Sequence, residues 1–232
     1  MPNSRLVTPS GCSFDLKGSR AVSDLVSDLM ADLNIPFVVQ RMAVYDIPQV
    51  MAIEKESFPL PWSATAYRHE LTQNDLSHYI VVRKQDPLSV LRRMRWFDRW
   101  LRGAKTRSAP VIGYSGFWIL GEEAHISTIA VWPDWRGHGI GELLLLAMIE
   151  LARALKAELV TLEVRVSNRV AQNLYRKYLF QETGLRHRYY RDNDEDALIM
   201  TTPHLEDPAF LEAFRRHRAV LSERLGSLVQ QP

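Results

Sequence analysis

Three alternate glycines follow an arginine in the segment Arg136-Gly-His-Gly-Ile-Gly141. Because glycine has no Cβ atom, its backbone can approach a ligand closely and can adopt positive φ. A helix that begins directly after such a turn presents unpaired N–H groups and the positive end of its dipole. Arg136 adds guanidinium donors that suit phosphate oxygens. The segment therefore predicts a cradle for a diphosphate between a strand and a helix.

The spacing of these glycines excludes two familiar phosphate-binding loops. The loop of nucleotide hydrolases ends in Gly-Lys-Ser/Thr, whereas Gly141 is followed by Glu and Leu. The dinucleotide fingerprint is Gly-x-Gly-x-x-Gly, whereas this loop is Gly-x-Gly-x-Gly. An ordinary glycine-rich turn is the alternative interpretation, since glycine is common in turns.

Glu163 is the carboxylate with the best position for acid–base chemistry. It belongs to a segment, 159–166, whose alternation of apolar and polar residues predicts a strand. A carboxylate buried on such a strand is expected to have a raised pKa. It can take a proton from an amine directly or through a water. The alternative is a structural ion pair with Arg165 on the same face.

The remaining elements must position these groups. Hydrophobic periodicity predicts strands at 37–44, 78–83, 111–120, 124–131, 159–166, 181–190 and 197–201. It predicts helices at 21–33, 47–58, 63–71, 140–155, 168–178 and 205–228. Ser63 and Asn168 stand where helix N-caps are expected. This order of elements is typical of an α/β protein.

Composition sets wider limits on the class of protein. A chain of 232 residues with 46% hydrophobic residues can bury a sizeable core, and a net charge of +2 does not indicate a nucleic-acid-binding protein. Cys12 is the only cysteine and the seven histidines form no His-Glu-x-x-His motif, so we expect no disulfide and no metal. The N-terminus lacks a secretory pattern and the apolar run 143–146 is too short to span a bilayer, so we expect a cytoplasmic protein.

With its flanks, the glycine segment resembles the acetyl-CoA loop of the GNAT superfamily of N-acetyltransferases, Arg/Gln-x-x-Gly-x-Gly/Ala. The likeness is strongest to the bacterial RimI-type enzymes, which acetylate the N-terminal alanine of a small-subunit ribosomal protein, and it covers roughly residues 37–200. It implies a GNAT fold, in which a mixed, strongly twisted sheet has helices on both faces. It also implies that acetyl-CoA lies between strands 124–131 and 159–166. The acetyl group would pass directly to a protein N-terminal α-amine.

The resemblance also implies roles for single residues. Glu163, in the block Leu162-Glu-Val-Arg-Val-Ser-Asn168, matches the family's general base. Tyr175 matches the tyrosine that protonates the coenzyme thiolate, and the alternatives are a core tyrosine or the nearby Tyr178. The coenzyme-binding positions are Ile129, Ala130, Val131, Arg136, Gly137, His138, Gly139, Ile140, Gly141 and Asn168, and the substrate-binding positions are Trp62, Tyr189 and Tyr190. A backbone amide at a bulge or splay of strand 124–131 would stabilise the carbonyl oxygen.

The chain departs from the RimI-type pattern in two places. The family has a short turn between its second and third strands, where this chain inserts residues 84–109. Within this insertion, 88–102 reads as a basic amphipathic helix that either packs on its own domain or contacts RNA or an anionic membrane. The family also has Leu-Gly-Phe after the tyrosine helix, whereas this chain has Leu179-Phe and lacks an easy glycine C-cap.

We therefore expect an N-acetyltransferase domain at 36–202, an N-terminal extension with one helix at 1–35, and a C-terminal helical extension at 203–232. The acceptor predicted by resemblance is a ribosomal protein N-terminus. A small amine or amino acid is the alternative acceptor, since the same loop would serve it. A module that docks on RNA or membrane through the basic insertion is the alternative outside enzymes. The sequence predicts no particular oligomeric state.

Overall fold

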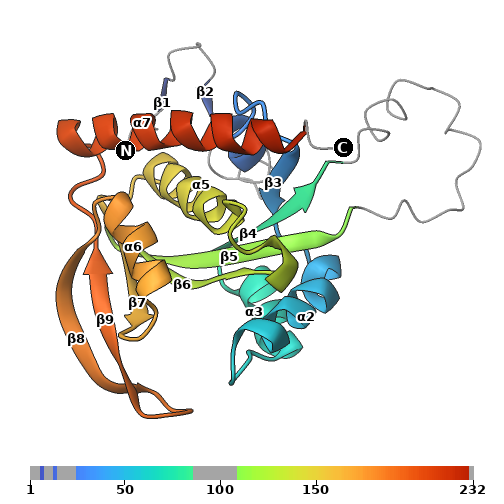
Figure 1. Ribbon diagram of the computed structural model, residues 1–232, viewed down its shortest axis with the longest axis vertical. Coiled ribbons are helices and arrows are strands. Elements are labelled where there is room, and N and C mark those ends of the chain that lie inside the picture. Colours follow the sequence, from blue (N-terminus) through green and yellow to red (C-terminus); the bar gives the residue numbers. More distant parts are fainter. Residues whose placement is uncertain (1–5, 8–12, 15–24, 86–108, 230–232) are drawn as a thin grey trace, which may run out of the picture.

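The computed structural model describes residues 6–7, 13–14, 25–85 and 109–229. Its main feature is a seven-stranded sheet (Figure 1). The strands are β3 (Phe37–Arg41), β4 (Ser77–Lys84), β5 (Val111–Leu120), β6 (Glu123–Val131), β7 (Leu159–Arg165), β8 (Gln181–Tyr190) and β9 (Glu195–Thr201). Their order is β3-β4-β5-β6-β7-β9-β8, and β6 with β7 is the one parallel pair in this sheet. Two-residue strands β1 (Leu6–Val7) and β2 (Ser13–Phe14) pair separately.

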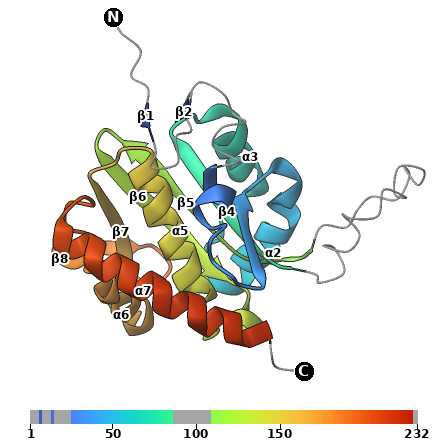
Figure 2. The same cartoon turned by 90° about the horizontal axis from the view of Figure 1, so that it is seen from above.

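Helices cover both faces of the sheet (Figures 1 and 2). On one face lie α2 (Ile47–Ser57) and α3 (Ala64–Gln73), and on the other lie α5 (Ile140–Ala154), α6 (Arg169–Lys177) and α7 (Pro208–Gly226). Short 3-10 turns are η1 (Val44–Asp46), η3 (Pro133–Trp135) and η4 (Ser227–Val229). Ser63 caps α3 by accepting a hydrogen bond from the Ala66 N–H at 3.1 Å. The expected GNAT-type layers are therefore present.

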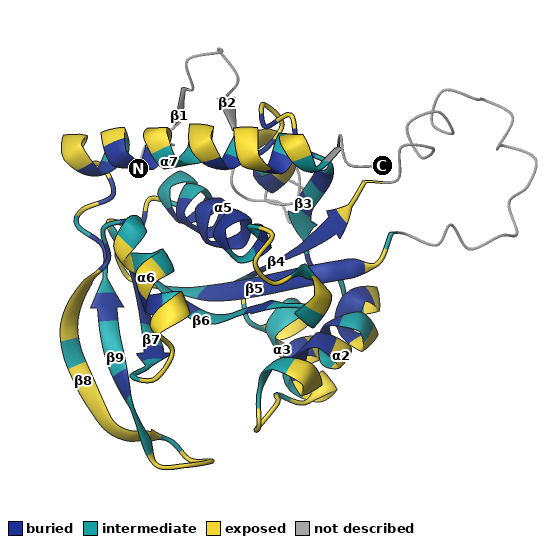
Figure 3. Ribbon diagram, in the orientation of Figure 1, coloured by how far each residue is buried: buried dark blue, intermediate teal, exposed yellow. Residues whose placement is uncertain are grey.

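The larger core lies between the sheet and α5. Residues 143–146 are fully buried because α5 has the sheet beneath it and other helices around it, as the dark ribbon in Figure 3 shows. Helix α7 adds Phe210, Phe214 and Leu221 to this core. The short helix at 25–29 packs on the same core, and its neighbour Asp32 pairs with Arg218 of α7. Segments from both ends of the chain therefore share the core of the central domain.

The predicted elements are largely confirmed. The strands expected at 111–120 and 181–190 have the bounds observed for β5 and β8. The first strand ends at Arg41 and the last begins at Glu195, a few residues from their expected ends. Most of the insertion 84–109, including the basic segment 88–102, lies outside the described residues.

The position at which the family has a glycine after α6 is occupied by a residue with positive φ. Leu179 has φ +62°, the left-handed conformation that the family's glycine would supply. A residue with a Cβ atom takes this conformation at a cost of roughly 1–2 kcal/mol. Leu179 is held there because its side chain packs on the larger core. The chain therefore takes the left-handed turn after α6 without a glycine.

No helix within the described ranges is long and apolar enough to cross a membrane. Those ranges also contain no group of three or more His, Cys, Asp or Glu side chains that could hold a metal ion.

Candidate active site

Strands β6 and β7 separate partway along the sheet. They pair from Glu123 with Leu159 as far as Ile126 with Leu162. Beyond that point β6 continues beside β5 and β7 continues beside β9. Such a splay leaves backbone groups of two adjacent strands available to a ligand in extended conformation.

A β-bulge marks the same point on β6. Gly116 pairs with Thr128 and Phe117 pairs with Ile126, so Ser127 is the extra residue. Because a bulge shifts the alternation by one, Ile126 faces the larger core before it and Ile129 faces that core after it. Ser127 Oγ donates to the Gly116 carbonyl at 3.1 Å.

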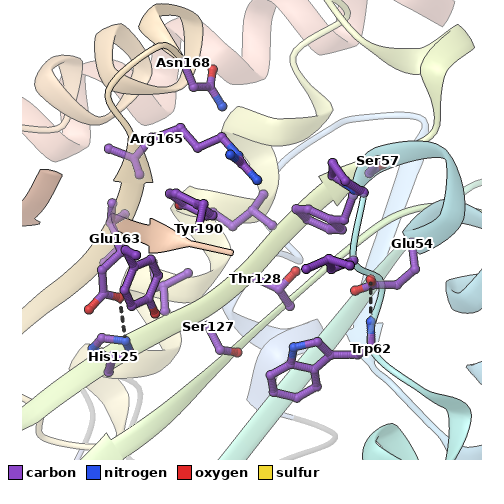
Figure 4. Close-up of a pocket in the computed structure, with 18 of the residues that line it drawn as sticks. Glu54, Ser57, Trp62, His125, Ser127, Thr128, Glu163, Arg165, Asn168 and Tyr190 are labelled. Atoms are coloured by element: carbon purple, nitrogen blue, oxygen red, sulfur yellow. Dashed lines mark hydrogen bonds and ion pairs between the residues drawn. The ribbon is translucent and has the colours of Figure 1, made fainter. Parts of the chain in front are cut away.

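A cleft of about 410 Å³ opens at the splay. It is lined by residues from α2 and the α2–α3 loop, from β5, β6 and β7, from α6 and from the end of β8. The lining includes Glu54, Ser57, Trp62, Trp118, His125, Ser127, Thr128, Ile129, Glu163, Arg165, Asn168, Tyr175, Tyr189 and Tyr190. In Figure 4, Glu163 and Tyr190 lie on one side of the cleft, Trp62 lies on the other, and Ser127 and Thr128 lie between them.

Glu163 is held by a histidine and an arginine from other strands. Its side chain is 6% exposed, and its carboxylate lies 3.0 Å from His125 Nε2 on β6 and 3.0 Å from Arg186 Nη2 on β8. Burial disfavours the charged form, but the hydrogen bond from His125 and the positive charges of His125 and Arg186 outweigh it, so the pKa of Glu163 is lowered. The expectation of a raised pKa was therefore wrong. The predicted alternative, an ion pair with Arg165, was also wrong.

The phenol of Tyr175 lines the cleft from α6, whereas that of Tyr178 does not. Burial raises the pKa of Tyr175, and repulsion from Tyr190 adds to the shift, so its hydroxyl stays protonated at neutral pH. The Tyr178 hydroxyl instead donates to Glu142 at 3.0 Å. Of the two tyrosines considered from the sequence, the structure places Tyr175 next to the splay.

Stacked aromatic rings run from His125, beside Glu163, to Trp62 on the other side of the cleft (Figure 4). The ring of Trp118 lies 6.1 Å from Trp62 and 6.0 Å from His125, with planes nearly parallel to both. Glu54, which is 2% exposed, fixes the Trp62 end of this stack by accepting hydrogen bonds from the backbone N–H of Trp62 at 3.2 Å and from the hydroxyls of Tyr67 and Tyr114. A buried carboxylate that accepts three hydrogen bonds therefore holds this end of the stack in place.

The tyrosine pair at the end of β8 is held over the cleft by Arg165. This guanidinium lies 3.8 Å from the Tyr190 ring centroid and pairs with Asp192 at 2.7 Å and Glu195 at 3.0 Å. The Tyr189 and Tyr190 rings pack edge to face at 5.2 Å. Arg165 therefore ties the β8–β9 hairpin to β7.

The glycine loop joins the end of β6 to α5. Gly137 and Gly139 have φ of +77° and +87°, so both take the left-handed conformation that favours glycine. Within the described residues, no acceptor is recorded for the backbone N–H groups of 137–142. Arg136 donates to the Val131 carbonyl at 3.1 Å and to Ser57 Oγ at 3.1 Å, which ties the loop to α2. The loop therefore presents unpaired donors at the start of a helix.

The structure brings most of the residues singled out from the sequence together. Glu163, Tyr175, Asn168, Ile129, Trp62, Tyr189 and Tyr190 line one cleft. Residues 130–131 and 136–141 lie outside its lining but continue directly from β6 into α5. The side chains of Ala130 and Ile140 are buried, and His138 Nδ1 lies 2.9 Å from the Arg136 carbonyl oxygen. At Ala130 and Ile140 only backbone groups are therefore suited to a ligand.

Reasoning from the sequence missed His125 and Glu54. His125 lies on β6 among apolar residues, and a polar side chain at such a position could have indicated a residue of the site. Glu54 is a buried acid inside α2, and its role was harder to predict from the sequence because a charged residue on a helix is usually solvated.

Comparison with known proteins adds an independent line of evidence. Residues 47–179 match the model of the acetyltransferase (GNAT) family. A Bacillus subtilis protein, named as a candidate ribosomal protein bS18-alanine N-acetyltransferase, is 39% identical over 162 residues, which cover 70% of this chain and 92% of that protein. An N-alpha-acetyltransferase RimI from Mycobacterium tuberculosis is 34% identical over 144 residues, which cover 60% of this chain and 74% of that protein.

Comparison with solved structures supports the same family relationship. The crystal structure of the ribosomal-protein-S18-alanine N-acetyltransferase from Escherichia coli superposes with a TM-score of 0.57 at 25% identity, covering 72% of this chain and 94% of that chain. The seven-stranded sheet, its splay and the sequence matches lead to one conclusion: this chain belongs to the GNAT family of acetyltransferases.

Proposed function

We propose that this chain transfers the acetyl group of acetyl-CoA to the N-terminal α-amine of a protein, and that its main acceptor is the N-terminal alanine of a ribosomal protein. The observation that carries the proposal is that Glu163 and Tyr175 line one cleft at the splay of β6 and β7. Proteins of similar sequence are named for acetylation of ribosomal protein bS18 at alanine, which supports the choice of acceptor. Because the proposed acceptor is a ribosomal protein, we also propose that the protein acts in the cytoplasm.

The chain offers donors suited to the diphosphate and the pantetheine arm of acetyl-CoA, the acetyl donor of this family. The unpaired N–H groups of 137–142 would hold the diphosphate. Backbone groups of 129–131, beyond the last β6–β7 pair, would bond the pantetheine arm as an added strand does. The side chain of Asn168 accepts from the Ala171 N–H at 3.1 Å, and its amide nitrogen remains available to the coenzyme. Acetyl-CoA supplies an activated acetyl group at the end of that arm.

Glu163 would act as the base. An N-terminal amine has a pKa of about 7.7–8.0, and it becomes far more acidic once its nitrogen has attacked the carbonyl carbon. A carboxylate whose pKa is lowered is ionised at neutral pH and can therefore accept that proton. The protonated Tyr175 would supply a proton to the departing sulfur. A backbone N–H near the bulge at Ser127 would stabilise the oxygen on which charge develops.

An acceptor panel tests the proposal. Purified protein and acetyl-CoA are incubated with a peptide that begins with the ribosomal alanine sequence, with the same peptide carrying a blocked N-terminus, and with a set of small amines and amino acids. We expect acetylation of the free N-terminus alone, detected by mass gain. Acetylation of the small amines with no modification of the peptide would support the alternative acceptor class instead.

His125 is a positioning residue whose replacement should change the pH response. In His125→Phe the phenyl ring can still stack on Trp118. Glu163, however, loses the hydrogen bond from the imidazole and the electrostatic attraction of that ring. Burial would then raise the pKa of Glu163, so its carboxylate would lose its charge at a higher pH than in the wild type. We expect the acid limb of kcat to move to higher pH.

The pH profile of kcat, and a ¹³C NMR titration of the Glu163 carboxyl, measure this shift. His204→Phe is a suitable control, because His204 is exposed and lies outside the cleft lining. An unchanged titration of Glu163 in His125→Phe would show that His125 does not set the charge of the base.

Arg165→Gln should weaken acceptor binding. This variant loses the ion pairs with Asp192 and Glu195 and the contact with Tyr190, so the turn end of the β8–β9 hairpin loses its side-chain anchor on β7, while the backbone pairing of β7 with β9 remains. We expect KM for the acceptor peptide to rise about tenfold, since charged hydrogen bonds contribute roughly 1.5–3 kcal/mol each when partly buried. KM for acetyl-CoA should change less than about twofold. Steady-state kinetics separate the two, and an equal rise in both KM values would contradict a role confined to the hairpin.

A further inference from the structure

Helix α7 crosses the glycine loop near its own C-terminal end. Leu221 and Leu225 are 1% and 0% exposed and belong to the core that contains α5. A Cβ atom added to Gly139 would lie 2.6 Å from Arg224 Nη2 and 3.1 Å from Leu225 Cδ2. The Arg224 guanidinium therefore rests directly against the backbone of the loop. This part of the chain lies beyond residues 47–179, which match the family model.

One carboxylate faces two cations at this point. Glu142, in the first turn of α5, is 6% exposed. It accepts from Arg224 Nη2 at 2.7 Å, from Lys177 Nζ at 2.5 Å and from the Tyr178 hydroxyl at 3.0 Å. Within the described residues neither cation has a second carboxylate partner, so this cluster carries one net positive charge beside Gly139.

Arg224 also keeps free donors. Its side chain is 49% exposed, and its recorded bond within the described chain uses one nitrogen, Nη2, on Glu142. A guanidinium has five N–H donors in a planar fork that suits phosphate oxygens. Glu142 fixes one edge of this fork, so the remaining N–H groups are held in place beside the loop at little further entropic cost.

We propose that Arg224, from the C-terminal helix, is a further coenzyme-binding residue that contacts a phosphate group of CoA beside the glycine loop. The inference rests on the proposed function, because it takes the loop to be the coenzyme site. The group is either the diphosphate or the 3′-phosphate of the nucleotide end, since both have the same anionic oxygens. In this view the C-terminal extension completes the coenzyme site.

Calorimetric titration of the full chain with CoA and with 3′-dephospho-CoA tests the proposal. We expect Arg224→Gln to bind CoA about tenfold more weakly than the wild type does, as the loss of one charged hydrogen bond predicts. Arg224→Lys, which keeps the charge, should retain part of the affinity. Arg216→Gln is the matched control, because Arg216 is an exposed arginine on the same helix.

Each outcome decides a different point. A loss with CoA but not with 3′-dephospho-CoA assigns Arg224 to the 3′-phosphate, and an equal loss with both assigns it to the diphosphate. Wild-type affinity in Arg224→Gln, or an equal loss in Arg216→Gln, would overturn the proposal. Thermal unfolding shows whether Arg224→Gln is folded, and Arg224→Lys provides the second test if it is not. A wild-type protein that binds neither compound would overturn the coenzyme site itself, and the proposal with it.

Discussion

Replacing Glu163 by Gln is expected to lower kcat at neutral pH by about 10²- to 10⁴-fold, the range typical for loss of a general base. Glutamine is nearly isosteric and can still bond His125 Nε2 and face Arg186, but it cannot accept a proton from the amine. The Kd for acetyl-CoA should stay within about twofold, because the coenzyme donors lie on the loop and on β6. Stopped-flow or steady-state kinetics and calorimetry measure the two quantities.

Glu123→Gln is the matched control for this experiment. Glu123 is another β6 carboxylate near His125, at 3.5 Å from Nδ1, but its side chain is 40% exposed and it does not line the cleft. We expect its kcat to change less than about twofold. If Glu163→Gln and Glu123→Gln have similar small effects, the proton is accepted elsewhere and the assignment of Glu163 as base is wrong.

Replacing Tyr175 by Phe is expected to lower kcat by about 10²-fold, because loss of a general acid removes a contribution of about 10²- to 10⁴-fold. The ring keeps its contact with Phe180 at 5.7 Å, so packing is conserved while the hydroxyl is lost. The effect should be smaller with an acetyl donor whose leaving thiol is more acidic, since such a thiolate needs less protonation. That dependence on the leaving group is the readout that a merely structural role would not produce.

Tyr178→Phe serves as the comparison in the same assay. The Tyr178 hydroxyl bonds Glu142, behind the glycine loop. Its loss should therefore weaken coenzyme binding more than it lowers kcat. A larger fall in kcat for Tyr178→Phe than for Tyr175→Phe would reverse the assignment of the acid.

The order of strands and helices could be predicted because each is a local property of the sequence. The alternation in 159–166 and the apolar stripe of 140–155 depend on neighbouring residues alone, and both elements form where expected. The glycines of the loop were also informative, since Gly137 and Gly139 do adopt the positive φ that glycine allows.

The electrostatics of Glu163 could not be predicted in this way. His125 and Arg186 lie 38 and 23 positions away in the chain, and they reach Glu163 only because β6, β7, β9 and β8 are adjacent in the sheet. Burial alone predicts a raised pKa for Glu163, and the hydrogen bond from His125 together with the attraction of His125 and Arg186 reverses the direction. The sequence therefore singled out this carboxylate but did not predict the direction of its pKa shift.

The bulge and Leu179 show a second limit. The resemblance implied a bulge or splay in strand 124–131, but the position of the bulge at Ser127 follows only from the pairing of β6 with β5. Leu179 adopts a conformation that a local preference would give to glycine, because packing on the core holds it there. In both cases tertiary contacts decide the backbone, and local propensity does not.

Mass spectrometry of protein N-termini from the source cells tests the central claim most directly. Cells that carry the wild-type gene, a deletion, or the deletion complemented with wild type or Glu163→Gln are compared. We predict that the ribosomal protein bS18 homologue begins with acetylated alanine in wild-type and wild-type-complemented cells, and with free alanine in the deletion and in Glu163→Gln. An N-terminus that stays acetylated in the deletion, or acetylation fully restored by Glu163→Gln, would contradict the account.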